Sequence, residues 1–170
     1  MEKRIRIPED FNLEERVEKA KDNFKAGFNC CQAVVLAYND IFGIDDETAA
    51  TMSSGFGGGM GRLREVCGSV SGMVMLAGFI HPAADPSIKT DRTANYRLVQ
   101  DCANEFKEIN GSYICKELLG LAPTAGRTES PEPSDRTAEY YKKRPCAELV
   151  GISARIIGKK MLEEWQNQEK

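Results

Sequence analysis

The stretch that decides the fold of this chain is Cys67-Gly68-Ser69-Val70-Ser71-Gly72-Met73-Val74-Met75-Leu76-Ala77-Gly78-Phe79. The segment is apolar on nearly every side of a helix, and a helix with that pattern is a buried one. Gly68 and Gly72 lie one turn apart, so a second backbone can approach the helix closely on that face. The wider weakly polar segment, 66–80, has 15 residues, which is short for a membrane span. The pattern therefore predicts a central helix in a packed core.

Helical periodicity continues on both sides of this stretch, whereas no segment alternates with the period of two that strands require. The other helices are expected at 13–26, 29–43, 45–53, 87–109, 112–119 and 145–165. The sequence thus predicts an all-α protein. Its single domain of six to eight helices spans 13–168, follows an N-terminal arm at 1–12, and carries an exposed loop at 121–135 that is rich in proline.

The composition restricts the class of protein. The chain has 170 residues, of which 41% are hydrophobic and 29% are charged, so it is neither a disordered tail nor a membrane protein. Its net charge of −3 argues against nucleic-acid binding, which requires a basic surface. The N-terminus has charges alternating with isoleucines and no apolar core of a secretory signal, so we expect a cytoplasmic location.

The six cysteines are the most informative residues. No pair has Cys-x-x-Cys spacing, which removes the usual sequence signatures of zinc knuckles and thioredoxin-type sites. Their positions relative to the expected helices say more. Four helix starts carry cysteine: Cys30 and Cys31 follow Asn29, Cys67 opens the central helix, Cys115 follows Ser112, and Cys146 follows Pro145. Cys102 lies in mid-helix on an apolar stripe and is predicted to be a core residue.

Cysteines at helix starts have a specific electrostatic consequence. The unpaired N–H groups and partial positive charge of a helix amino terminus favour thiolate over thiol. An anionic iron–sulfur cluster held by four thiolates would suit a place where such termini converge. Arg62, Arg64 and the basic run at 142–144 either add positive charge to that place or are solvated basic turns.

A glycine-rich segment lies just before the central helix. It includes Gly57, Gly58, Gly59 and Gly61, followed by Arg62. The segment matches neither a dinucleotide-binding fingerprint nor a P-loop, because the glycine spacing is wrong and no Lys-Ser/Thr pair closes it. Two interpretations remain open: a tight turn that allows close backbone approach, or a nest of N–H groups facing an anion or a cluster.

Five segments together carry a family resemblance. They occur in order between Gly27 and about Ile157: Gly27-Phe28-Asn29-Cys30-Cys31-Gln32-Ala33-Val34, Gly55-Phe56-Gly57-Gly58-Gly59-Met60-Gly61-Arg62, Glu65-Val66-Cys67-Gly68-Ser69-Val70-Ser71-Gly72, Cys115-Lys116-Glu117-Leu118-Leu119-Gly120 and Cys146-Ala147-Glu148-Leu149-Val150. The chain resembles the C_GCAxxG_C_C family of redox-active proteins, named for its cysteine pattern. That resemblance implies a helical domain similar to the C-terminal part of split-Soret cytochromes, in which cysteines are associated with an iron–sulfur centre.

Carried over residue by residue, the resemblance places the four cysteine ligands at Cys30, Cys67, Cys115 and Cys146. The sequence departs from the name pattern, because Cys67 follows Val66 and is followed by Gly68-Ser69. Cys31 stands where a small residue is expected, so it could substitute for Cys30. The haem-binding part of split-Soret proteins has no counterpart here, and haem is not implied.

Three functions follow from these observations. The first is electron transfer to an unidentified redox partner through a [2Fe–2S] cluster bound by the four cysteines. The second is metal-free thiol–disulfide exchange, which would make the chain an oxidoreductase and could use the adjacent Cys30 and Cys31. The third is a helical interaction module with a structural zinc site or with buried thiols alone. A homodimer is also expected, because split-Soret relatives are dimeric and the helix at 145–165 carries two overlapping apolar stripes.

Overall fold

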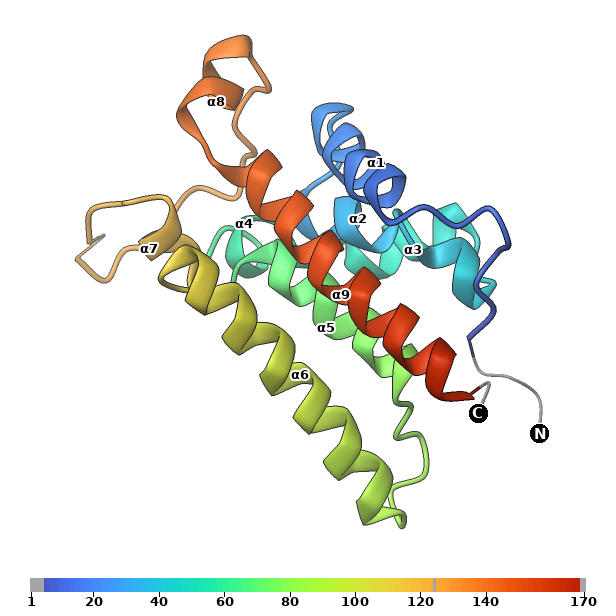
Figure 1. Cartoon of the computed structure of the whole chain (residues 1–170). Coiled ribbons are helices and arrows are strands. Elements are labelled where there is room, and N and C mark those ends of the chain that lie inside the picture. The colour runs from blue at the N-terminus through green and yellow to red at the C-terminus, as the bar shows by residue number, and fades with distance from the viewer. Residues whose placement is uncertain (1–4, 124, 169–170) are drawn as a thin grey trace.

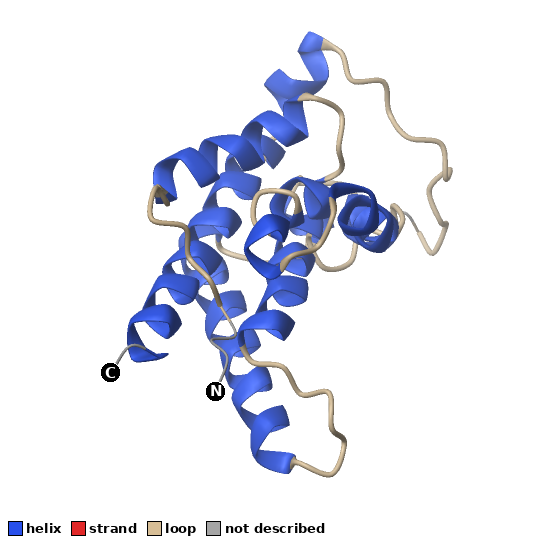
Figure 2. Cartoon of the chain, turned by 90° about the vertical axis from the view of Figure 1, so that its right-hand side faces the viewer, coloured by secondary structure: helices blue, strands red, loops and turns tan. Residues whose placement is uncertain are grey.

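The computed structural model describes residues 5–123 and 125–168. Within them the chain is built of helices and loops and contains no strand (Figure 2), so the predicted all-α fold is confirmed. The helices in chain order are α1 (Leu13–Lys25), α2 (Cys30–Val35), the 3₁₀-helix η1 (Asn39–Phe42), α3 (Asp46–Ser53), the 3₁₀-helix η2 (Ser54–Phe56), α4 (Gly57–Met60), α5 (Gly68–Ile80), α6 (Lys89–Asn110), α7 (Cys115–Leu118), α8 (Ala138–Lys143) and α9 (Cys146–Gln168). Because α4 contains left-handed residues, eight right-handed α-helices remain among the described residues.

The central helix is α5, as its composition predicts. It packs against α2, α6 and α9, and it buries Val70, Met73, Leu76 and Ile80 between them. In Figure 1, α5 and α9 run in the same direction, so their amino ends lie on the same side of the molecule. Both of these ends carry a cysteine, which brings two of the predicted site residues to one end of the core.

The last helix, α9, is buried by its own chain. It packs along α1 and also contacts α2, α5 and α6. Members of both apolar stripes are buried there, including Leu149, Val150, Ile156, Ile157 and Met161. The two stripes are therefore used inside the domain, and α9 does not by itself argue for a second subunit. The homodimer stays a prediction that rests on the family resemblance.

The prediction of one continuous helix at 29–43 is wrong in one respect, because the helix ends at Val35. A turn separates α2 from η1, and Tyr38 leaves the helical conformation with φ of −139°. The side chains explain the break: the Tyr38 hydroxyl donates to the carbonyl oxygen of Ala154 in α9 at 2.7 Å. The Asn39 amide donates to the Ile44 carbonyl and to Asp46 at 2.7 and 2.8 Å. The Tyr38 hydroxyl and the Asn39 side-chain NH₂ thus obtain partners that a continuous helix would not give them, whereas the buried Asn39 Oδ1 has no hydrogen-bond partner among the described residues.

Two further differences concern the approach to the site. Ser112 does not cap α7; its hydroxyl accepts from the Ile114 N–H, and the helix then begins at Cys115. The short helix α8 was not predicted, although Thr137 caps it by accepting from the Tyr140 N–H. The N-terminal stretch packs on the domain through Ile5, which is fully buried. None of the helices in 5–123 and 125–168 has the length and apolar character needed to cross a bilayer.

Candidate cysteine redox centre

Four cysteines stand at the amino ends of four helices, as predicted. Cys30, Cys115 and Cys146 are the first residues of α2, α7 and α9, and Cys67 is the residue preceding α5. All are free thiols. Of these four helices, only α5 and α9 are longer than two turns, so most of the positive end-charge comes from those two.

Cys67 and Cys115 are joined by backbone hydrogen bonds. Val66 and Ile114 form an isolated antiparallel bridge. Next to it, the Cys67 N–H donates to the Tyr113 carbonyl at 2.9 Å, and the Cys115 N–H donates to the Glu65 carbonyl at 2.6 Å. Residues almost fifty positions apart in sequence are thereby fixed side by side, so the start of α7 lies beside the start of α5.

Cys30 lies close to α5 because α5 has glycine at the points of contact with α2. A Cβ added at Gly68 would lie 2.9 Å from the Phe56 carbonyl oxygen and 3.1 Å from Cys30 Cβ. A Cβ at Gly72 would lie 2.9 Å from Val34 Cβ, one turn further along α2. The predicted close approach at this glycine pair is therefore confirmed, and the approaching backbone is that of α2.

Cys30 also interacts with the thiol of Cys146 across the amino ends of α2 and α9. This interaction and burial raise the pKa of Cys30. The same interaction lowers the pKa of Cys146. Burial raises the pKa of Cys67 to about 12, and it also raises the pKa of Cys115, where the Arg64 guanidinium partly offsets it.

Cys31 points away from this group. It is fully buried in a separate small cluster with Val35, Leu36 and Ala49, and its sulfur lies 3.6 Å from that of Met75. Burial raises the pKa of Cys31 to about 12. Cys102 is fully buried in mid-helix, as expected for a core residue. Of the adjacent pair, Cys30 is the one that faces the other site cysteines.

The glycine-rich segment is a left-handed turn. Gly58, Gly59 and Gly61 have φ of 64°, 70° and 59°, and Met60 and Arg62 between and after them have 68° and 67°. Successive left-handed residues are costly for any residue with a side chain, which explains the density of glycine. Strain at residues other than glycine is typical of functional segments.

Both interpretations of this segment find support in the contacts. A Cβ at Gly57 would lie 2.6 Å from Asn29 Cβ, and one at Gly59 would lie 2.7 Å from Cys115 Cβ, so the glycines allow close approach. The N–H groups from 61 to 65 all donate to carbonyls of 57–60 and are not free for an anion. The Gly58 N–H is different, because it faces the sulfur of Cys30 and slightly offsets the rise in the pKa of that thiol.

A cavity of about 350 Å³ lies over these residues. Cys30, Cys115 and Cys146 line it, together with Gly57, Gly58 and Gly61 of the left-handed turn. Cys67 lies outside the lining and is 4% exposed. Its sulfur is 3.2 Å from the Ser69 hydroxyl, which is 3.0 Å from the buried Ser153 hydroxyl of α9. The hydroxyls give this buried sulfur polar partners.

Four arginines and one tyrosine also line the cavity, beside Asn29, Ser54, Leu119, Pro131, Pro133 and Ser134. The arginines are Arg62, Arg64, Arg136 and Arg144. The Arg136 guanidinium lies 4.5 Å from the centroid of the Phe24 ring and 5.0 Å from that of Tyr140, and Arg144 lies 4.9 Å from Tyr140. Sequence reasoning recognised Arg62, Arg64 and Arg144 as basic neighbours, but it missed Arg136 and Tyr140. Their only sequence signal was a cluster of aromatic and basic residues within 136–144.

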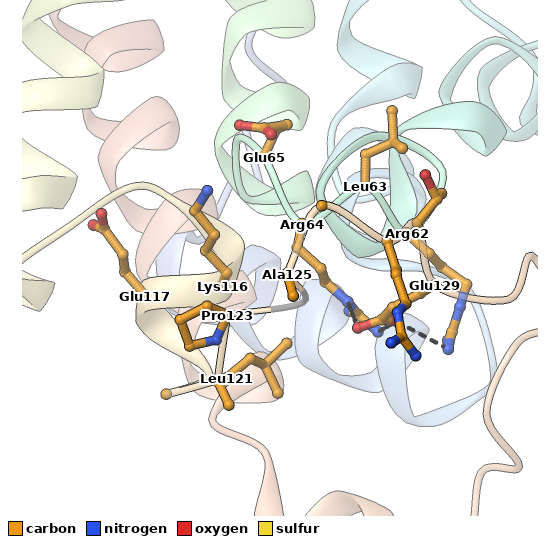
Figure 3. A pocket seen from close by; sticks show the side chains of 15 residues that line it. Arg62, Leu63, Arg64, Glu65, Lys116, Glu117, Leu121, Pro123, Ala125 and Glu129 are labelled. Carbon is orange, nitrogen blue, oxygen red and sulfur yellow. Dashed lines mark hydrogen bonds and ion pairs between the residues drawn. The ribbon is translucent and has the colours of Figure 1, made fainter.

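A second, more open cleft of about 870 Å³ shares Arg62 and Arg64 with the cysteine cavity (Figure 3). Charges of both signs line it, including Lys116, Arg127 and Glu117. The loop predicted at 121–135 forms one wall, and most of its described residues are exposed. Glu129 of this loop forms ion pairs with Arg62 and Arg64 at 3.2 and 2.8 Å.

The residues fit an iron–sulfur cluster by donor type. Four thiols are the usual ligand set for such a cluster, and thiolates beside basic side chains and helix starts suit its negative charge. No group of three or more His, Cys, Asp or Glu side chains in the described chain is gathered around one metal-sized point.

Fold and cavity together define a helical protein built around clustered thiols. Residues 28–160 match the family described as "Putative redox-active protein (C_GCAxxG_C_C)". The match covers most of the chain, and the chain belongs to this family. Neither a curated protein nor a solved structure matches it significantly.

Proposed function

We propose that this protein transfers electrons through a [2Fe–2S] cluster bound by Cys30, Cys67, Cys115 and Cys146. The observation that carries the proposal is that three of these thiols line one cavity, while the fourth is held beside it by the bridge to Cys115. When bound, the cluster would supply one-electron transfer. Cluster binding would also require these buried thiols to release their protons.

The chain's own residues have distinct roles in this proposal. The Gly58 N–H and the amino ends of α5 and α9 stabilise negative charge on the sulfurs. The Ser69 hydroxyl orients Cys67. Arg136 and Tyr140 line the cavity on the α8 side. The Gly58 N–H, the helix ends and Arg136 together favour anionic ligands.

Anaerobic reconstitution with iron and sulfide tests the proposal. We expect the wild-type protein to develop visible absorption bands and, after one-electron reduction, an EPR signal of a [2Fe–2S] centre. Each Cys→Ser variant at the four positions should lose most of the bound iron. Cys102→Ala is the control and should load normally. A colourless wild-type protein, prepared beside a control that loads, would exclude the cluster.

A second function is favoured by the interacting pair of Cys30 and Cys146. In metal-free protein, the Cys146 thiolate would attack a partner's disulfide, form a mixed disulfide and expel one partner sulfur as a thiolate. Cys30, after losing its proton to solvent, would then attack the Cys146 sulfur and release the second partner sulfur. The chain would end with a Cys30–Cys146 disulfide, and two electrons would have passed to the partner's two thiols.

Two measurements separate these functions. Peptide mapping of metal-free protein treated with oxidised glutathione should reveal a Cys30–Cys146 disulfide if exchange is the function. A random mixture of disulfides, or none, would count against exchange. Elemental analysis separates iron from the structural zinc of the third hypothesis.

A further inference from the structure

Arg64 is the one arginine whose guanidinium is in contact with a site sulfur among the described residues. Its Nη1 lies 3.8 Å from Cys115 Sγ. Its side chain is only 8% exposed. Arginine cannot lose its charge in a protein, so a permanent positive charge lies against this sulfur.

Hydrogen bonds to three residues hold Arg64 in this position. Its Nε and Nη2 donate to the two carboxylate oxygens of Glu129 at 3.1 and 2.8 Å (Figure 3). Its backbone N–H donates to the Gly58 carbonyl at 3.2 Å, and its carbonyl accepts from the Lys116 N–H at 3.2 Å. The side chain and both peptide groups are therefore fixed. Because Lys116 follows Cys115 in α7, its hydrogen bond connects the Arg64 backbone to the helix that carries this cysteine.

Arg64 also has a left-handed backbone, with φ of 61°. Long side chains rarely adopt this conformation, whereas glycine and asparagine adopt it more easily. Arginine at this position therefore carries a backbone strain that glycine would avoid.

Arg62 provides a matched comparison within the same turn. Its φ is 67°, and it also pairs with Glu129, at 3.2 Å. Its Nε, however, donates to the Ser130 carbonyl at 2.8 Å, and its Nη1 reaches the Ser134 hydroxyl at 3.4 Å. Arg62 thus has the charge, the conformation and the acidic partner of Arg64 without the sulfur contact.

We propose that Arg64 hydrogen-bonds the Cys115 sulfur in the cluster-loaded protein and raises the reduction potential of the centre. The inference rests on the proposed function. Reduction adds one electron from the electrode or mediator, and no covalent bond forms or breaks. A positive charge and a hydrogen bond at a ligand sulfur stabilise the more negative, reduced state. Low solvent access at Arg64 limits the screening of this effect.

The experiment compares Arg64→Gln with Arg62→Gln in anaerobically reconstituted protein, by redox titration followed in the visible spectrum. For Arg64→Gln we expect about a tenfold lower ratio of reduced to oxidised centre at a fixed potential, which corresponds to 59 mV for one electron. For Arg62→Gln the midpoint potential should shift by less than a third of that voltage. Equal shifts in both variants, or no shift in Arg64→Gln, would overturn the role of Arg64.

Arg64→Lys provides a second measurement if Arg64→Gln loads poorly. Lysine keeps the charge but loses the planar fork that binds Glu129 and the sulfur together. Its potential should be below that of the wild type, and a potential equal to or above that of the wild type would contradict the proposal. A wild-type protein that binds no cluster would instead refute the proposed function, so the two failures can be distinguished.

Discussion

Tyr38 and Ala154 are joined by a buried hydrogen bond that sets α9 against the segment following α2. The Tyr38 hydroxyl donates to the Ala154 carbonyl at 2.7 Å, and both residues are fully buried. Cys30 begins α2 eight residues before Tyr38, and Cys146 begins α9 eight residues before Ala154. The bond therefore fixes the relative position of the two helices whose first residues form the Cys30–Cys146 pair.

Replacing this tyrosine should weaken the fold. Tyr38→Phe removes the donor but leaves the ring, and the Ala154 carbonyl loses a buried partner. We expect a loss of about 1 kcal/mol in the free energy of unfolding, measured by urea denaturation. Tyr96→Phe is the control, because Tyr96 is 58% exposed and should behave like the wild type. An unchanged urea midpoint in Tyr38→Phe would show that the bond does not stabilise the fold.

A methyl group should be tolerated at Gly55, before the left-handed turn, but not at Gly59 inside it. Gly59 has φ of 70°, and an added Cβ would lie 2.7 Å from Cys115 Cβ and 2.8 Å from the Glu65 nitrogen. Gly59→Ala should cost about 2–4 kcal/mol of stability and reduce iron loading, because the backbone must move away from α7. Gly55→Ala is the matched control, since nothing lies within 4 Å of its added Cβ. Equal stability and iron content in the two variants would contradict this account of the turn.

Substitutions of the two adjacent cysteines, Cys30 and Cys31, should differ in their effect on iron loading. Cys30→Ala removes a thiol that lines the cavity, so iron content after reconstitution should fall several-fold. Cys31→Ala removes a thiol packed beside Met75, so loading should persist while stability falls by about 1 kcal/mol because a small cavity forms. Iron determination on both variants checks the assignment. Loss of iron in Cys31→Ala alone would exchange the roles of the two cysteines.

The ion pair between Arg16 and Asp40 predicts a pH effect on stability. Partial burial raises the pKa of Asp40. The Arg16 guanidinium, whose Nη2 lies 2.8 Å from the Asp40 carboxylate, lowers the pKa by more than burial raises it, so the pKa lies below its usual range. A lowered pKa contributes stability above the unfolded value of about 3.9, and that contribution is lost as the pH falls through the folded value. Because Asp40 is half exposed, we expect at most about 0.5 kcal/mol at pH 7.

Asp40→Asn tests this effect. The variant should unfold at lower urea concentration than the wild type at pH 7, and the difference should shrink as the pH is lowered through 4 toward 2. A difference that is constant across this range would mean that the charge of Asp40 is not the cause.

The sequence was sufficient for the features that depend on local chemistry. Asn29 and Asp45 cap helices through their side chains, so the starts of α2 and α3 were predictable. Gly68 and Gly72 marked the close approach to α5, although the approaching helix was not identified. Cysteines at helix starts were predictable for the same reason, since capping residues and prolines mark those starts within a few positions.

The remaining features depend on contacts between residues distant in sequence. The turn at Tyr38 forms because a carbonyl in α9 accepts its hydroxyl, and nothing near Tyr38 in the sequence indicates that partner. The bridge between Val66 and Ile114 and the contact of Arg64 with Cys115 are likewise long-range. The two stripes of α9 were ambiguous because periodicity shows that a face is apolar but not which helix covers it. The dimer therefore requires its own measurement, such as light scattering.

The central claim is that the four cysteines hold a cluster, and the iron and acid-labile sulfide content of anaerobically purified protein tests it most directly. We predict about two irons and two sulfides per four-cysteine site, with iron lost in the Cys146→Ser variant and retained in Cys102→Ala. Anaerobically purified protein that contains no iron, or contains zinc without sulfide, and that takes up no cluster on reconstitution would contradict the claim.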